Sequence, residues 1–125
     1  ADYYDEHILN SGLTSYAHPL GLAAMKAVLD HFEDKDFIAS LELLKKAFAE
    51  ELAETKKLKA VGDIRARGLL AAVFLKGGRK LSWKEGLAAG LHLAIKENTV
   101  ILAPPYVMTA GELRDGFRRL RGLIK

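Results

Sequence analysis

The spacing of apolar residues changes along this chain from a helical to an extended period, and this change limits the folds that the chain can adopt. One set of apolar residues steps by three and four, the period of an amphipathic helix: Phe37, Leu41, Leu44, Phe48 and Leu52. Residues 69–75 then form a β-favouring run, closed by Gly77 and Gly78 as a turn signal. A helix followed by sheet-forming segments predicts a mixed domain, and 125 residues suffice for one such domain.

Two further helices are expected, one near each end of the chain. The first covers residues 19–32, where apolar residues recur at helical spacing after Pro19, a residue that suits a first helical turn. The last begins at Thr109, which forms a capping box with Glu112. Its predicted apolar face consists of Leu113, Phe117, Leu120 and Ile124.

Strands and turns fill the interval between the second helix and the last. Besides 69–75, strands are expected at 61–65, which has the weaker pattern of the two, at 92–95 and at 99–102. A short helix opens at Ser82, a turn falls at Glu97-Asn98, and Pro104-Pro105 ends the last strand. The predicted fold class is α+β, with helices packed on one face of a small, mostly antiparallel sheet.

Composition excludes several classes of function. The chain has no cysteine, which rules out a disulfide framework, a thiolate metal site and a cysteine nucleophile. No apolar run approaches the roughly 18 to 20 residues of a membrane span, and the opening residues are acidic and polar, so we expect a soluble, cytoplasmic protein. The missing initiator methionine predicts a processed or excised chain. The formal charge of +3 is spread along the sequence, which argues against a nucleic-acid partner.

The loop ahead of the first helix carries the polar groups that best suit a binding site. Thr14 and Ser15 follow Gly12 there, and their hydroxyls and backbone N–H groups either converge on an anion such as phosphate or only cap the helix. His18 is either a base or ligand, or a structural residue that caps the helix or is buried. The other histidines have no metal-type spacing to it, so no metal site is expected, and neither a nucleophile elbow nor a phosphate loop is present.

Four segments in order resemble class III aminotransferases, enzymes of the ornithine and ω-amino-acid type that depend on pyridoxal 5'-phosphate (PLP). Residues 12–24, GLTSYAHPLGLAA, are similar to the family's Gly-x-Thr-x-x-x-His-Pro-x-x-x-Ala-Ala. VGDIRARGLLAAVFL resembles its Val-Gly-Asp-Val-Arg-Gly-x-Gly-Leu segment, and TVILAPPYVMTAGEL resembles its Ala-Pro-Pro-Leu-x-Ile-Thr-x-x-Glu. A basic amphipathic helix ends both chains, so the likeness covers nearly the whole sequence.

The resemblance implies that the chain is the C-terminal segment of a fold-type I PLP enzyme. Residues 1–17 would be a loop leading from the large cofactor-binding domain, 18–33 the helix linking the two domains, and 34–125 the small α+β domain. The lysine that forms the Schiff base with PLP lies upstream of the Gly-x-Thr motif, so no catalytic residue is expected here and the chain alone would be inactive. Its implied partners are the remainder of the polypeptide, a second subunit in a homodimer, and amino-acid or amine and keto-acid substrates.

The resemblance also implies site residues. Thr14 matches a threonine that hydrogen-bonds the PLP phosphate of the neighbouring subunit, with Ser15 as a secondary candidate. Many relatives hold the substrate carboxylate with an arginine shortly before the Pro-Pro segment, and Lys96 stands at the most plausible equivalent position. Lacking the bidentate fork of arginine, Lys96 either binds the acid more loosely, or the substrate differs, or the residue is only a solvated strand end. Ala66 and Tyr106 stand where the family usually has glycine and leucine.

Two functional hypotheses from different classes remain. The first is an aminotransferase that moves an amino group between an amino acid or ω-amino compound and a keto acid, with this chain as its C-terminal part. The alternative is an isolated, non-catalytic α+β domain that dimerises or binds another protein, since the lysine is missing and the helices keep apolar faces. A reading frame that extends upstream to a strand followed by a lysine favours the enzyme, whereas a genuine start just before Ala1 favours the isolated domain.

Overall fold

The computed structural model describes residues 6–7, 17–78 and 80–125. The chain divides into two compact units, Ala1–Lys35 and Asp36–Lys125. Within the described ranges, no helix combines the length and the apolar character that crossing a bilayer requires.

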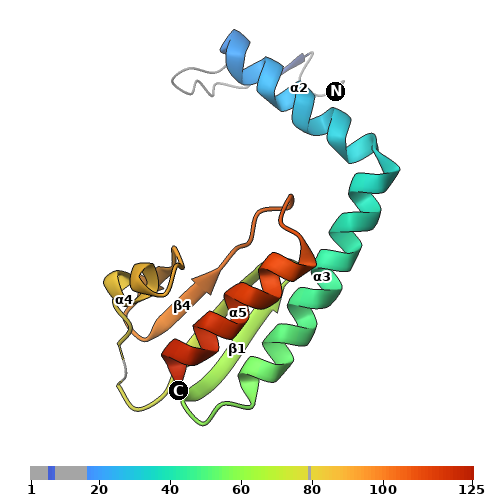
Figure 1. The fold of residues 1–125 in the computed structure, drawn as a ribbon. Coiled ribbons are helices and arrows are strands. Elements are labelled where there is room, and N and C mark those ends of the chain that lie inside the picture. Colours follow the sequence, from blue (N-terminus) through green and yellow to red (C-terminus); the bar gives the residue numbers. More distant parts are fainter. Residues whose placement is uncertain (1–5, 8–16, 79) are drawn as a thin grey trace. The chain divides into compact units, whose positions relative to one another are not determined.

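The described part of the first unit is dominated by helix α2, Pro19–Glu33 (Figure 1). Pro19 occupies the first helical position, where its fixed φ favours the helix and its missing N–H costs nothing. The helix predicted at 19–32 is therefore confirmed. No residue of α2 is buried, and the residues of its predicted apolar stripe are all exposed: Leu22, Met25, Leu29 and Phe32.

The second unit contains the remaining helices and a four-stranded sheet. Its elements are α3 (Lys35–Lys56, starting at the unit boundary), β1 (Val61–Arg67), β2 (Leu70–Leu75), α4 (Trp83–Ala88), β3 (Ala94–Lys96), β4 (Thr99–Leu102) and α5 (Ala110–Ile124). The strand order is β1-β2-β4-β3, and each neighbouring pair is antiparallel. The predicted α+β fold class is confirmed.

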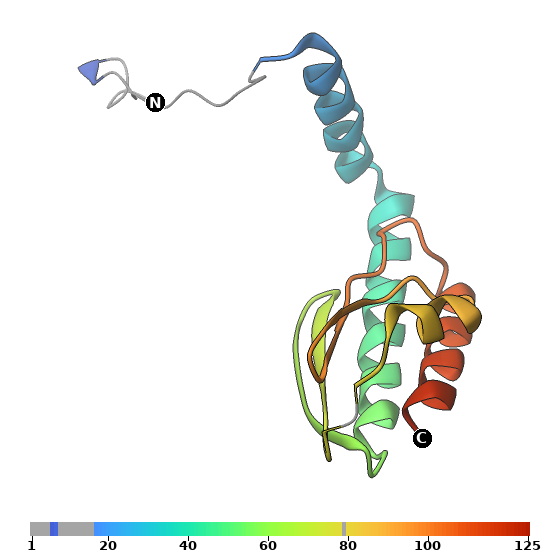
Figure 2. The same cartoon turned by 90° about the vertical axis from the view of Figure 1, so that its left-hand side faces the viewer.

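Helices α3 and α5 lie side by side on one face of the sheet, as Figures 1 and 2 both show. The core forms between that face and the two helices, because alternate side chains of β2 and β4 point toward them. The buried sheet residues include Ala71, Val73, Leu75 and Val100. The buried residues of α5 are the four that the helical spacing predicts, whereas α3 is buried from Leu44 onward and leaves Phe37 and Leu41 only partly covered.

Two strands differ from the sequence expectation. Strand β1, expected to be short, is seven residues long, because it pairs along its length with the buried strand β2. The segment expected at 92–95 becomes a strand only at Ala94–Lys96. Its start is set by the pairing of Ala94 with Ile101 across the predicted Glu97-Asn98 turn. Asn98 ties that turn to β2, since its side-chain Nδ2 donates to the Leu75 carbonyl at 3.0 Å.

Capping boxes begin both α4 and α5, as the sequence predicts for α5. At α5, the Thr109 backbone N–H and hydroxyl donate to Glu112 Oε2 at 2.9 and 2.7 Å, and the Glu112 N–H donates to Thr109 Oγ1 at 3.2 Å. The backbone hydrogen bond from Thr109, followed by that from its hydroxyl, lowers the pKa of Glu112 below the ordinary 4.5. The same arrangement joins Ser82 and Glu85 at α4.

This lowered pKa predicts an acid-sensitive contribution to stability. Because the folded-state pKa of Glu112 lies below 4.5, the contribution is complete above that pH and is lost as the pH falls through the lowered value. We expect the difference in free energy of unfolding between the parent chain and Glu112→Gln to be largest near neutral pH and to shrink in acid. Urea unfolding at about pH 7 and about pH 3 measures it. An equal difference at both pH values would contradict the assignment.

Candidate functional site

The residues expected to hold the cofactor phosphate, Thr14 and Ser15, lie outside the described residues. The described chain resumes at Ala17, whose φ of 56° is left-handed, and reaches the helix at His18. His18 occupies the N-cap position, but its side chain makes no capping hydrogen bond and is exposed. His18 therefore caps the helix through its backbone and not through its side chain, and the alternative that it is buried is wrong. Only its backbone carbonyl contributes, accepting the Leu22 N–H at 2.9 Å.

Lys96, the candidate for the substrate carboxylate, is the last residue of β3 at one edge of the sheet. It is exposed and pairs across the β3–β4 turn with Thr99. Because Ile95, its neighbour, packs against the core, Lys96 projects from the opposite face, which α3 and α5 do not cover. Among the described residues, no hydrogen bond or ion pair engages its ammonium group.

The strand register places further charges on the same uncovered face. One cross-strand row contains Asp63, Phe74, Thr99 and Lys96, and the next contains Arg65, Ala72, Ile101 and Ala94. Arg67 and Leu70 form a third, shorter row at the β1–β2 hairpin. Side chains directly opposite each other on paired strands project to the same side, so all three rows share this face.

Asp63 and Arg65 are held by neighbours on β1, β2 and α3. Lys56 Nζ lies 2.7 Å from Asp63 Oδ1, and Arg65 Nε lies 3.5 Å from Asp63 Oδ2. The hydrogen bond from Lys56, aided by the Ile64 N–H, lowers the pKa of Asp63 below its ordinary value. The Arg65 guanidinium also lies over the Phe74 ring, 5.2 Å from its centroid. These contacts fix the Arg65 side chain on the sheet.

A hollow of about 400 Å³ lies on the uncovered face beside these charges. Its lining comes from β1, β2 and β4: Arg65, Ala66, Arg67, Leu70, Ala71, Ala72 and Ile101. Leu70 and Ile101 are 56% and 38% exposed, so the hollow has an apolar floor and guanidinium groups at one side. Arg67, Leu70 and Ile101 were not among the predicted site residues. Strict alternation along the predicted strands 69–75 and 99–102 would have placed Leu70 and Ile101 opposite the buried residues, whereas Arg67 lies beyond the predicted strand 61–65.

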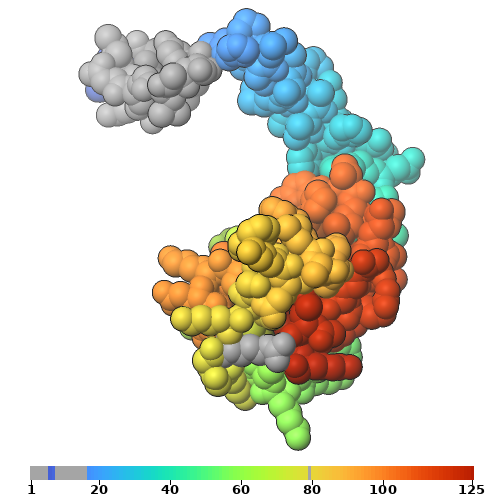
Figure 3. All heavy atoms as spheres, turned by 60° about the vertical axis from the view of Figure 1, so that its left-hand side comes forward, coloured from blue at the N-terminus to red at the C-terminus, as the bar shows by residue number. Residues whose placement is uncertain are grey.

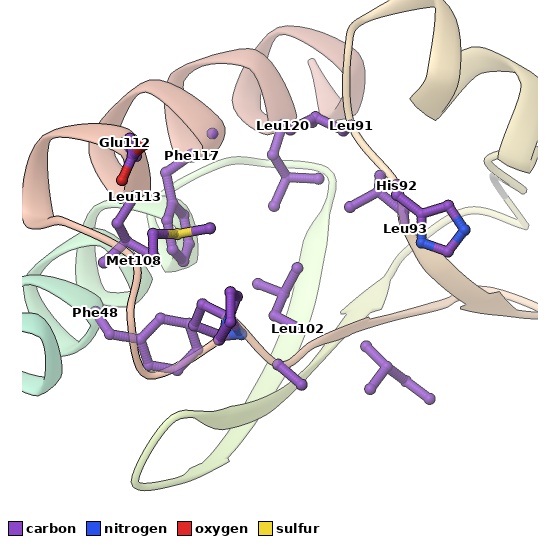
Figure 4. A pocket seen from close by; sticks show the side chains of 15 residues that line it. Phe48, Leu91, His92, Leu93, Leu102, Met108, Glu112, Leu113, Phe117 and Leu120 are labelled. Atoms are coloured by element: carbon purple, nitrogen blue, oxygen red, sulfur yellow. The ribbon is translucent and has the colours of Figure 1, made fainter. Parts of the chain in front are cut away.

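A second hollow, of about 190 Å³, lies on the helix-covered side (Figure 4). Its lining is apolar apart from His92 and Glu112, and Glu112 already caps α5. Phe48, Met108 and Phe117 lie together on one side of it, and Leu91 and Leu93 lie on the other (Figure 4). No lysine lines either of the two hollows.

The segment after α4 contributes Leu91, His92 and Leu93 to the lining of this second hollow, and the residues around α4 lie beside α5 on the surface seen in Figure 3. Arg119 of α5 donates from Nη1 to the Ala89 carbonyl at 3.2 Å, and a β-carbon added at Gly90 would lie 2.7 Å from the same nitrogen. Gly90 also has a positive φ of 73°, which glycine adopts without steric cost. The absence of a side chain at Gly90 therefore lets the loop approach α5.

Comparison with known proteins shows which family this chain belongs to. The sequence model of the family described as Aminotransferase class-III matches residues 4–124. The chain belongs to the class III aminotransferase family. It is 35% identical over 115 residues to acetylornithine aminotransferase of Corynebacterium efficiens, covering 90% of this chain and 28% of that protein. It is 30% identical over 118 residues to adenosylmethionine-8-amino-7-oxononanoate aminotransferase of Methanocaldococcus jannaschii, covering 84% of this chain and 26% of that protein.

Solved structures share this fold. The crystal structure of the Methanocaldococcus jannaschii aminotransferase superposes with a TM-score of 0.80 at 27% identity, covering 99% of this chain and 31% of that chain. A taurine:2-oxoglutarate aminotransferase from Bifidobacterium kashiwanohense, solved in complex with PLP and glutamate, also gives 0.80, at 24% identity. This class III aminotransferase segment thus has the fold of its fold-type I relatives and spans about 28% of the curated relative from Corynebacterium efficiens.

Proposed function

We propose that this chain is the C-terminal part of a PLP-dependent aminotransferase that transfers an amino group between an amino acid or ω-amino compound and a keto acid. The observation that carries the proposal is the family match over residues 4–124, which includes all four motif segments. Because the chain spans only about 28% of a curated relative, the activity belongs to a longer polypeptide, acting as a homodimer. A cytoplasmic location stays a prediction.

We place the lysine that binds PLP covalently elsewhere in the longer polypeptide. When bound, PLP supplies an electron sink for amino-acid chemistry. The contribution proposed for this chain is the loop before α2, in which the Thr14 hydroxyl, with Ser15 beside it, donates a hydrogen bond to the cofactor phosphate across the dimer interface.

The exposed apolar face of α2 supports a role as part of a larger assembly. Leu22, Met25, Val28, Leu29 and Phe32 are 40 to 56% exposed, and burying large apolar side chains is favourable by roughly 1.5 to 3 kcal/mol each. The remainder of the aminotransferase polypeptide would cover this face. The same exposure also supports the alternative function, a non-catalytic domain that dimerises or binds another protein through α2.

Intact mass, gel filtration and an absorbance scan of the native material separate these functions. A long polypeptide that elutes as a dimer and shows the visible absorbance of bound PLP supports the aminotransferase. A colourless protein of 13.7 kDa that binds a partner or itself, and transfers no amino group in the presence of added PLP, supports the alternative. A long polypeptide that neither binds PLP nor transfers an amino group would contradict the aminotransferase proposal.

We propose that Lys96 attracts the carboxylate of a small substrate. Lys96 is an exposed cation on the uncovered face, and no residue that the structure describes forms an ion pair with it. Lys96→Gln in the full-length enzyme should raise KM for such a substrate about tenfold, with little change in kcat, if the contact is made equally in ground and transition states. Lys59→Gln, another exposed lysine, is the matched control. Equal KM values for the Lys96 and Lys59 variants would show that Lys96 is only a solvated strand end.

A further inference from the structure

We propose that the hollow on the uncovered sheet face is a carboxylate subsite for an aliphatic substrate and that Arg67 binds the carboxylate. This inference rests on the proposed function and deepens it. An aminotransferase acts on two substrates, and Lys96 is proposed to bind the carboxylate of one small substrate at the β3 edge of the sheet. The probe that fits the hollow is a linear aliphatic monocarboxylate, with its chain on the apolar floor and its charge at the hairpin.

Arg67 differs from its neighbour Arg65 in having an uncommitted guanidinium group. Arg65 is engaged by Asp63 and the Phe74 ring, whereas no hydrogen bond or ion pair engages Arg67 among the described residues. Arg67 is exposed and ends β1 at the two-residue hairpin turn, where Gly68 has a φ of 58°. Its backbone position is fixed by pairing with Leu70. The strand therefore presents a planar fork of donors that can bind a carboxylate through two hydrogen bonds.

The floor of the hollow favours an aliphatic body next to that charge. Leu70, directly opposite Arg67 in the register, is 56% exposed, and Ile101 is 38% exposed. Ala72 lies between Arg65 and Ile101 in the same cross-strand row, and its small side chain keeps the floor low. An aliphatic chain laid on these residues removes apolar surface from water on both sides.

The charges around the hollow select an anion. No carboxylate lines it, and Asp63, the acid in the neighbouring row of the same face, is paired with Lys56 at 2.7 Å. A carboxylate at Arg67 therefore meets cations and an apolar floor, without a facing acid to repel it. A ligand with a cationic head would meet two guanidinium groups and be disfavoured.

Lys96 and Arg67 are too far apart to hold one carboxylate together. They lie on β3 and β1, the two edge strands, and three strand spacings separate these by roughly 14 Å. The two cations therefore act independently. Because Lys96 is itself proposed to bind a carboxylate, the matched control for Arg67 is Lys59→Gln, an exposed cation that lines neither hollow.

Titration of the ¹⁵N-labelled 125-residue chain with octanoate tests the subsite without requiring PLP or activity. We expect saturable shifts of backbone amides at the hairpin and at Ile101, about tenfold weaker binding in Arg67→Gln, partial retention in Arg67→Lys, and unchanged binding in Lys59→Gln. Octanamide keeps the aliphatic chain without the charge, and inorganic phosphate supplies charge without the chain, so both should bind more weakly. Equal binding of octanamide, no saturable binding of octanoate, or an equal loss in Lys59→Gln would overturn the proposal.

Kinetics of the full-length enzyme connect the subsite to catalysis. Arg67→Gln should raise KM for 8-aminooctanoate about tenfold, with little change in kcat, and leave KM for alanine unchanged. An equal rise for both substrates would overturn the assignment of Arg67 as a specificity-determining residue. If the enzyme transfers no amino group from any donor, the proposed function fails, while the octanoate titration still decides whether the subsite exists.

Discussion

Replacing Phe48 by alanine is expected to lower the free energy of unfolding of the second unit by about 3 to 5 kcal/mol. Phe48 is only 1% exposed, and its ring meets Phe117 of α5 edge to face, with centroids 5.6 Å apart at 69°. Truncation removes this contact and the apolar surface that joins α3 to α5 and the sheet. The cost is high because close-packed neighbours on three elements cannot all collapse into the space left behind.

Urea unfolding of the 125-residue chain, followed by far-UV circular dichroism, measures this effect. Leu43→Ala is the control from the same helix, since Leu43 is 65% exposed and surface truncations usually cost less than about 0.5 kcal/mol. A double-mutant cycle with Phe117→Ala should give a coupling of about 0.5 to 1.5 kcal/mol between the two rings. Equal effects of Phe48→Ala and Leu43→Ala would mean that the α3–α5 contact is not part of a cooperative core.

Replacing Thr14 by alanine is expected to weaken PLP binding by the full-length enzyme about 10- to 100-fold. The proposal assigns the Thr14 hydroxyl a hydrogen bond to the cofactor phosphate, and a bond to a charged group contributes about 1.5 to 3 kcal/mol. Alanine removes the donor without adding bulk. Because the phosphate of one subunit would be bound by the loop of the other, the loss should appear in the dimer without preventing its formation.

Titration of the apoenzyme with PLP, followed by visible absorbance, measures the affinity, and gel filtration checks that the variant remains dimeric. Ser15→Ala is the neighbouring control and should have the smaller effect. A PLP affinity unchanged by Thr14→Ala would assign the threonine to helix capping, the other interpretation that its position allows. A larger effect from Ser15→Ala would transfer the phosphate contact to Ser15.

The sequence was sufficient to predict features that depend on interactions between residues close together in the chain. Thr109 and Glu112 form the predicted capping box, and the spacing of Leu113 and Phe117 identifies the buried side of α5. Both depend on interactions within one or two helical turns, which sequence separation specifies directly. The α+β class was predictable for the same reason, because helical and extended periods differ and each leaves one face to bury.

The bounds of two strands depend on pairing between segments that are distant in the sequence, and local patterns could not predict them. The start of β3 at Ala94 depends on its partner Ile101 in β4, and the length of β1 depends on β2. His18 was expected to be either functional or a structural cap, yet its side chain neither caps α2 nor is buried. Hydrogen bonding and burial of such residues are properties of their neighbours in space, which propensity does not encode.

The amino-acid sequence by itself determined the family, the order of helices and strands, and the absence of cysteine chemistry, since these follow from residue identity and spacing. Only the tertiary structure decided which side chains share a surface. It placed Arg67, Leu70 and Ile101 around one hollow, paired Asp63 with Lys56, and set Lys96 on the opposite edge strand. The physical reason is that strand register and sheet order bring residues far apart in the chain within reach, and both are fixed by long-range pairing and burial.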